Sequence, residues 1–302
     1  MQLKFSQFFI ILLLNFTYSS ANAEILFSDS FESGDFSTSA AEVNTINLAY
    51  TYNRTGVVTQ IGDESSMTYP SSFTRSDIQD WTAKTGSHSM LFDHAAGVNM
   101  AEQRFNFNPL QDEIWLQYWI RVPVNYSHGT GGGGASNNKF LALWMDGYIQ
   151  EGTGSTVVLS MENAGSGNTD LAFTYTQANG EATAFQQHVP FINIETDRGK
   201  WMQMVVHLKF GTTNGSDSTL ETWRKWEDES SFTQLHQTST ANMTKGSSNG
   251  WGGGYFMGWV NGTYAEDTWW LIDDILISDT SLLDTSDTSL ATPPTNFTGE
   301  AQ

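Results

Sequence analysis

Basic, amide and aromatic side chains alternate with apolar ones in several short segments of this chain. In a β-strand alternate side chains share a face, so each segment would present one apolar and one polar face. If the polar faces lie on one concave sheet, they form a groove suited to a sugar chain. A solvated face is the alternative, but in a chain with 33 acidic and 13 basic residues it would be rich in Asp and Glu. The polar positions are Arg104, Asn106, Gln117, Trp119, Arg121, His207 and Lys209.

Such a groove would hold the groups that β-elimination of a uronate-containing polysaccharide requires. The reaction needs a cation or amide to neutralise the carboxylate, a base for the C5 proton and an acid for the leaving oxygen. One tyrosine can act as both base and acid, so we predict Tyr255 or His207 as the base. The predicted neutralising residues are Arg104, Gln117, Lys139 and His207. Further substrate contacts are predicted from Trp119, Arg121, Asn106 and Lys209.

Two other functions compete with a lyase. A non-catalytic, calcium-dependent, lectin-like protein would share the aromatic groove, and this alternative stays open. Retaining glycoside hydrolysis would usually need a carboxylate pair on one strand, as in an ExDxxE arrangement, and no such spacing occurs in the sequence; residues 227–229, Glu-Asp-Glu, are typical of a solvated turn. The six histidines are scattered without the spacing of a zinc site.

Four acidic residues near the two ends of the chain could hold a calcium ion. Asp29 and Glu32 belong to an N-terminal segment, and Asp273 and Asp274 belong to the last apolar segment. If the two segments pair, carboxylates and backbone carbonyls cluster, which is the ligand set that Ca²⁺ prefers. We predict a structural Ca²⁺ there, in a chain without cysteines and hence without disulfides. A water-exposed acidic edge is the alternative.

The elements that must position these side chains are predicted to be strands. Ten short segments show apolar alternation and are separated by Gly, Asn, Ser and Asp clusters, which predicts an all-β sandwich of two antiparallel sheets. The polar, irregular segment from 40 to 80 receives no assignment. The Gly-rich loop 129–138 is of a kind that often borders a binding groove, and plain linkage between two strands is the equally common alternative. The predicted strands are 89–92, 103–107, 114–122, 139–145, 156–161, 171–177, 201–210, 220–226, 255–260 and 269–278.

The two ends of the chain carry a resemblance to a known fold. Residues 27–36 read FSDSFESGDF, residues 86–92 read GSHSMLF and residues 270–277 read WLIDDILI. Together they resemble the concanavalin A-like jelly rolls and carbohydrate-binding modules, in which the first and last strands lie side by side.

A second set of segments, 102–105, 115–122 and 199–207, is similar to strands of secreted jelly-roll polysaccharide lyases. The resemblance covers about 26–278 and implies a jelly roll that uses Lys or Arg with Tyr and often His. The RxEL, QIH and YFKxGxYNQ motifs of one large alginate-lyase family are absent from the sequence.

The N-terminus has the organisation of a signal peptide. Lys4 precedes an apolar run from Phe8 to Phe16, and residues 21–23 read Ala-Asn-Ala before Glu24. The run is too short for a membrane anchor. We therefore predict that residues 1–23 are removed and that the protein is secreted or periplasmic. One domain is expected over 24–279, followed by a Thr/Ser/Pro-rich disordered tail or linker over 280–302.

The charge of the chain narrows the range of partners. The formal net charge is −20, and nucleic acids and anionic membranes both attract basic surfaces. We expect neither as a partner. The remaining expectation is a monomer that binds a polysaccharide, and the basic groove residues favour an acidic one.

Overall fold

The described residues fold into strands alone. A computed structural model describes residues 24–36, 42–53, 75–80, 82–129, 137–145, 147, 154–176, 182–183, 188–212, 215–245 and 250–283 of the 302. Its regular elements are sixteen β-strands. Within these ranges no helix is long and apolar enough to cross a membrane.

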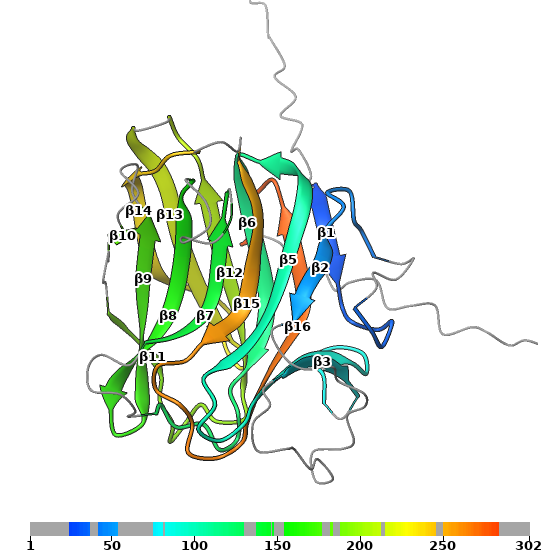
Figure 1. The fold of residues 1–302 in the computed structure, drawn as a ribbon, viewed down its shortest axis with the longest axis vertical. Helices are drawn as coiled ribbons and strands as arrows, with labels where there is room; N and C mark the ends of the chain where they lie inside the picture. Colours follow the sequence, from blue (N-terminus) through cyan, green and yellow to red (C-terminus); the bar gives the residue numbers. More distant parts are fainter. Residues whose placement is uncertain are drawn as a thin grey trace, which may run out of the picture.

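The strands form two antiparallel sheets, which Figure 1 shows as stacked layers. Sheet A runs in the order β14 (Thr233–Asn242), β13 (Ser216–Trp226), β12 (Trp201–Lys209), β6 (Glu113–Arg121), β16 (Thr268–Ser278), β4 (Ser89–His94) and β3 (Arg75–Gln79), and β1 (Ile25–Asp29) pairs with β16. Sheet B runs in the order β10 (Ala182–Thr183), β9 (Asn168–Thr176), β8 (Thr156–Gly165), β7 (Asn137–Trp144), β15 (Trp251–Trp259), β5 (Met100–Gln111) and β2 (Ala49–Asn53), and β11 (Val189–Ile192) pairs with β9.

The chain passes back and forth between the sheets. Strands β4, β5, β6 and β7 alternate between sheet A and sheet B, and so do β14, β15 and β16. This alternation is typical of a jelly roll, in which neighbours in sequence lie in facing layers. The predicted all-β jelly-roll sandwich is confirmed.

Period-two alternation builds the core between the layers. In β6 the side chains of Leu116, Tyr118 and Ile120 are at most 1 % exposed and belong to the main core cluster. Burying an apolar side chain of this size contributes about 1.5–3 kcal/mol. The intervening positions of β6 face outward, as predicted. All ten predicted strands are present, with ends shifted by a few residues.

Other strands escaped prediction because their sequences are polar or short. β14 reads TQLHQTSTAN, and only Leu235 and Ala241 of this strand join the main core. It lies at the edge of sheet A, where one side of the strand needs no partner and polar residues are favoured. β2 and β3 fall in the segment that received no assignment, and β10 and β11 are short.

The two ends of the domain meet as predicted. In the antiparallel pair of β1 and β16, Ser28 lies opposite Leu276 and Asp29 lies opposite Ile275. The predicted domain end at 279 is too early, because Leu282 is 1 % exposed and packs against Trp115 on the outer face of sheet A. The predicted signal peptide and residues 284–302 of the predicted tail lie outside the described residues.

Candidate functional site

The predicted groove residues lie on the outer faces of two opposite sheets. Sheet B carries Arg104, Asn106, Lys139 and Tyr255, and sheet A carries Gln117, Trp119, Arg121, His207 and Lys209. The prediction of one shared groove is therefore wrong. Alternation tells which side chains of a strand share a face, but it does not tell which strands share a sheet.

Three of the predicted residues come together on adjacent strands of sheet B. Tyr255 of β15 lies directly opposite Arg104 of β5 and, on its other side, Ala142 of β7. A Cβ atom at Gly258 would lie 3.0 Å from the ring of Tyr255 and 3.5 Å from the Cβ of Lys139. Lys139 and Tyr255 therefore flank the same glycine. We call the surface around Arg104, Lys139 and Tyr255 the sheet-B face.

Arg104 is held in place by a carboxylate and an indole. Its Nε donates to Oε1 of Glu102 at 2.6 Å, and its guanidinium carbon lies 5.5 Å from the ring centroid of Trp144. Trp144 in turn packs on Tyr255, with ring centroids 5.8 Å apart. This packing fixes the position of a cation that is still partly accessible.

A glycine in β15 lets these side chains lie close to the sheet. A Cβ atom at Gly253 would come within 2.5 Å of Oδ1 of Asn106 and 2.9 Å of Nε1 of Trp144. Any larger residue at Gly253 would displace Asn106 or Trp144. The run Trp-Gly-Gly-Gly-Tyr at 251–255 thus keeps the middle of the sheet-B face open.

Glu162 is a candidate site residue that was not predicted from the sequence. It lies on β8, two residues after Ser160, which pairs with Lys139. Its side chain is 5 % exposed, Oε1 accepts a hydrogen bond from the Ser160 hydroxyl at 3.5 Å, and Oε2 has no partner among the described residues. Burial raises the pKa of Glu162, against the opposing charge of His188. Alternation along β8 could have identified Glu162, but the predicted strand ended at 161.

Tyr255 lies at the floor of the sheet-B face. It is 1 % exposed, and it forms a small apolar cluster with Ala142, Trp144 and Val158. Its hydroxyl is thus covered by its neighbours, whereas Arg104 and Lys139 are partly exposed. The cations form the accessible part of this face.

His207, a predicted catalytic residue, belongs to an ion-pair cluster on sheet A. Its Nδ1 lies 2.7 Å from Oε2 of Glu221, and its Nε2 lies 2.9 Å from Oε1 of Glu113. Lys209 pairs with the other oxygen of Glu113 at 2.8 Å. These bonds tie β6, β12 and β13 together across the outer face of sheet A. His207 is too remote from Lys139 and Tyr255 to act with them, because the whole sandwich separates the two faces.

The remaining predicted residues on sheet A contact protein groups. Lys84 Nζ lies 4.4 Å from the ring centroid of Trp119, and Arg121 Nε donates to the carbonyl of Gly199 at 3.1 Å. Gln117 is 7 % exposed. These side chains cover the outer face of sheet A and do not extend the sheet-B face.

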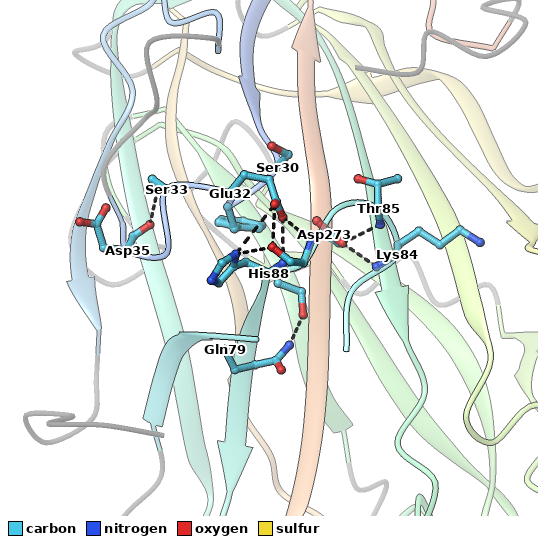
Figure 2. Close-up of polar contacts among 12 residues, drawn as sticks. Ser30, Glu32, Ser33, Asp35, Gln79, Lys84, Thr85, His88 and Asp273 are labelled. Carbon is cyan, nitrogen blue, oxygen red and sulfur yellow. Dashed lines mark hydrogen bonds and ion pairs between the residues drawn. The ribbon is translucent and has the colours of Figure 1, made fainter. Parts of the chain in front are cut away.

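The predicted calcium ligands are directed at backbone N–H groups and at hydroxyls. Asp273 accepts from the N–H groups of Lys84 and Thr85, at 2.7 and 3.2 Å, while Glu32 accepts from those of Ser87 and His88, both at 2.8 Å (Figure 2). The first and last elements of the domain thus fasten one loop, residues 84–88. Asp274 accepts from the Thr85 hydroxyl at 2.7 Å, and Asp29 accepts from the Phe31 N–H and the Tyr50 hydroxyl, both at 2.8 Å.

Burial raises the pKa of three of these acids, Asp29, Asp273 and Asp274, whereas the pKa of Glu32 is lowered because its hydrogen bonds from Ser87 and His88 outweigh its burial. Burial raises the pKa of Asp29 to about 7, and burial together with the charge of Asp274 raises the pKa of Asp273 to about 8. A cation nearby would relieve this. However, within the described ranges no group of three or more His, Cys, Asp or Glu side chains is placed to hold a metal ion. The four carboxylates do not form a calcium cage by themselves, and calcium stays a prediction.

Comparisons with known proteins give distant structural similarities. No family model matches the chain, and no curated protein is similar to it. The alginate lyase of family PL-14 from Aplysia kurodai aligns at 12 % identity over 68 % of this chain and 87 % of its own, with a TM-score of 0.49. The alginate lyase Aly36B aligns at 12 % identity over 64 % and 81 %, with a TM-score of 0.47. The cellulose-induced protein Cip1 aligns at 14 % identity over 84 % and 97 %, with a TM-score of 0.43. At such identities, function must be argued from the chain's own side chains.

Proposed function

We propose that the sheet-B face binds an acidic, uronate-containing polysaccharide and cleaves it by β-elimination. One observation carries this proposal: Arg104, Tyr255 and Lys139 occupy the neighbouring strands β5, β15 and β7. The chain has a net charge of −20, and this face holds two cations beside a tyrosine, with the carboxylate of Glu102 paired to Arg104. Arg104 and Lys139 are the groups on this face that suit an anionic ligand.

In the proposed mechanism, Arg104 and Lys139 bind the uronate carboxylate. Their positive charge stabilises the negative charge that moves into the carboxylate when the C5 proton leaves. Tyr255, acting as the phenolate, takes up that proton and becomes the neutral hydroxyl, the bond from C4 to the leaving oxygen breaks, and a C4=C5 double bond forms. Glu162 donates a proton to the leaving oxygen, because its raised pKa favours the protonated form that a general acid needs.

A lectin-like protein without catalysis is the second candidate, and one observation favours it. Tyr255 is 1 % exposed, so in a lectin-like protein it would only pack the floor of this face while the partly exposed cations bind the glycan. Both candidates use the same face and the same anionic ligand. They differ in turnover alone.

The deciding experiment incubates the protein with a panel of uronate polymers and follows the ultraviolet absorbance of the unsaturated product. We expect Lys139→Ala and Arg104→Ala to lower kcat/KM by about 100-fold, since each removes a charge that stabilises the transition state. Tyr255→Phe should abolish turnover while retaining binding. Lys209→Ala, which removes a lysine from the opposite sheet, is the matched control and should keep full activity.

Two results would reject the catalytic proposal. One is full activity of both Lys139→Ala and Tyr255→Phe, which would place the reaction elsewhere. The other is the absence of unsaturated product from every polymer while the protein still binds a uronate glycan, which would establish the lectin-like function.

The site of action is proposed to be outside the cytoplasm, either secreted or periplasmic. The support is the sequence of residues 1–23. N-terminal sequencing of protein from the culture medium or periplasm should give Glu24 as the first residue. Recovery of extracellular protein that still begins at Met1 would contradict this.

A further inference from the structure

An exposed indole stands at one end of the sheet-B face. Trp259, the last residue of β15, is 40 % exposed, and no other aromatic side chain in the described part of the chain is as open to solvent. Its neighbours Met257 and Val260 are completely buried in the core. Trp259 is thus the one exposed residue of a strand whose other residues are all buried.

Trp259 lies beside the proposed catalytic cations. Val260 forms an antiparallel bridge with Asn138 of β7, so the next positions along these segments, Trp259 and Lys139, lie across from one another. On the other side Trp259 pairs with Met100 of β5. The indole therefore continues the sheet-B face beyond Lys139, on the same side of the sheet.

The indole is fixed by two asparagines at its edge. Its Nε1 donates to Oδ1 of Asn261 at 2.7 Å, and Nδ2 of Asn261 donates to Oδ1 of Asn137 at 2.6 Å. The backbone N–H of Asn261 also donates to the carbonyl of Asn137 at 3.0 Å. These bonds hold the polar edge of the ring and orient it before any ligand arrives, which lowers the entropic cost of binding.

We infer that Trp259 forms a sugar-stacking subsite, in which a pyranose ring of the polysaccharide packs its C–H face on the indole next to the uronate held by Lys139. An aromatic face suits the apolar C–H groups of a sugar ring, and the asparagine amides suit its hydroxyls. This inference rests on the proposed function and adds to it the residue that binds the neighbouring sugar unit.

The test compares Trp259→Ala and Trp259→Phe with the parent on a uronate polymer and on its oligosaccharides of increasing length. On the polymer, Trp259→Ala should raise KM, or the dissociation constant measured by retention in a polymer-containing native gel, by about tenfold, with kcat nearly unchanged. Trp259→Phe should restore most of the affinity. Oligosaccharides too short to reach Trp259 should bind all three proteins equally.

The control variant for Trp259, and the results that would reject the subsite, differ from those that test the proposed function. Val124→Ala removes another exposed apolar side chain, 54 % exposed and outside the strands, and should behave as the parent. If the parent binds or cleaves the polymer and Trp259→Ala matches it at every length, the subsite is rejected while the proposed function stands. If the parent neither binds nor cleaves any uronate polymer, both are rejected.

Discussion

The ring of His207 is stacked on the ring of Trp115, with centroids 3.9 Å apart and planes inclined by 11°. Both nitrogens of His207 face carboxylate oxygens, which can only accept hydrogen bonds. His207 lies between Glu113 and Glu221, within hydrogen-bond distance of both. His207 therefore links three neighbouring strands of sheet A, which are β6, β12 and β13.

The first prediction is that His207→Ala destabilises the protein without changing its catalytic activity, because His207 links three strands but lies far from the sheet-B face. The substitution leaves Glu113 and Glu221 without their shared hydrogen-bond partner, which we expect to lower the free energy of unfolding by about 2–4 kcal/mol. Turnover per folded molecule should be unchanged. Urea unfolding and activity assays check both parts. Lys209→Ala removes an exposed ion pair and should cost about 1 kcal/mol or less. Normal stability with lost turnover would instead return His207 to the active site.

Sequence patterns predicted the faces of the strands but not their sheets. In β6 the inward positions of Leu116 and Tyr118 follow from alternation of apolar and polar residues alone. Arg104 and Gln117 are only 13 positions apart, and yet they lie on opposite outer faces, because the chain crosses between the layers near Asp112. Which layer a strand joins depends on pairing with distant strands, here β15 for β5 and β16 for β6, and local sequence carries little of that information.

At the two ends of the domain, too, some features could be predicted from local sequence and others depended on distant parts of the chain. The pairing of β1 with β16 was predictable because both segments have recognisable sequences. The hydrogen bonds of their carboxylates were not, since the partners of Glu32 and Asp273 come from the loop 84–88, whose polar sequence has no periodic pattern. Glu42, which accepts from the Ser28 hydroxyl at 2.7 Å, lies in the segment that received no assignment.

The second prediction concerns two glycines with positive φ. Gly86 has a φ of +60° and Gly97 a φ of +72°, but a Cβ at Gly86 would lie 2.4 Å from the carboxylate of Glu32, whereas nothing lies within 4 Å at Gly97. Both alanine variants carry backbone strain of about 1 kcal/mol. Gly86→Ala should lose about 1–3 kcal/mol more in urea unfolding, because it also displaces the carboxylate that binds Ser87 and His88.

A double variant separates the backbone strain at position 86 from the steric clash between its Cβ atom and the carboxylate of Glu32. Adding Glu32→Ala to Gly86→Ala removes the obstructing carboxylate, so the two substitutions together should cost less than the sum of their separate effects. Equal losses for Gly86→Ala and Gly97→Ala would show that the contact with Glu32 contributes nothing.

Calcium gives the third prediction. If an ion binds near Asp274 in the folded state alone, a chelator should lower the melting temperature of the parent by mass action. Asp274→Asn keeps a residue type that tolerates the φ of +49° at this position, and it should remove the response to chelator. Melting curves with and without chelator check both proteins. Superimposable curves for the parent would leave the hydrogen bonds to the loop 84–88 as the sole function of these acids.

The fourth prediction is a loss of stability in acid caused by His94. Complete burial lowers the pKa of His94 to about 3, against about 6.5 in the unfolded chain. Below pH 6.5 the unfolded form therefore gains a proton that the native form does not accept. The stability contributed by neutral His94 is fully present above the unfolded pKa and is lost as pH falls towards 3, by up to about 1.4 kcal/mol per pH unit.

The matched variant for this measurement is His94→Phe. It keeps a ring against Tyr264, whose centroid lies 5.3 Å from that of His94, and it removes the titration. Between pH 7 and pH 5 the parent should lose about 2 kcal/mol more than the variant in urea unfolding. Parallel stability curves over this range would show that His94 does not contribute to acid sensitivity.

The last prediction assigns the alkaline side of the activity profile to Glu162. Burial raises the pKa of this carboxyl, and a general acid works only while it holds its proton. Activity on a uronate polymer should therefore fall as pH rises through the raised pKa. Glu162→Gln keeps the size of the side chain and its contact with Ser160 but cannot transfer a proton, so we expect kcat to fall about 100-fold and that limb of the profile to disappear.

Asp170→Asn, which removes the carboxylate of the residue paired with Glu162 on β9, is the matched control and should retain the profile of the parent. If Glu162→Gln keeps both the rate and the alkaline limb, the proton for the leaving oxygen comes from another group, and Tyr255 would then have to serve as both base and acid.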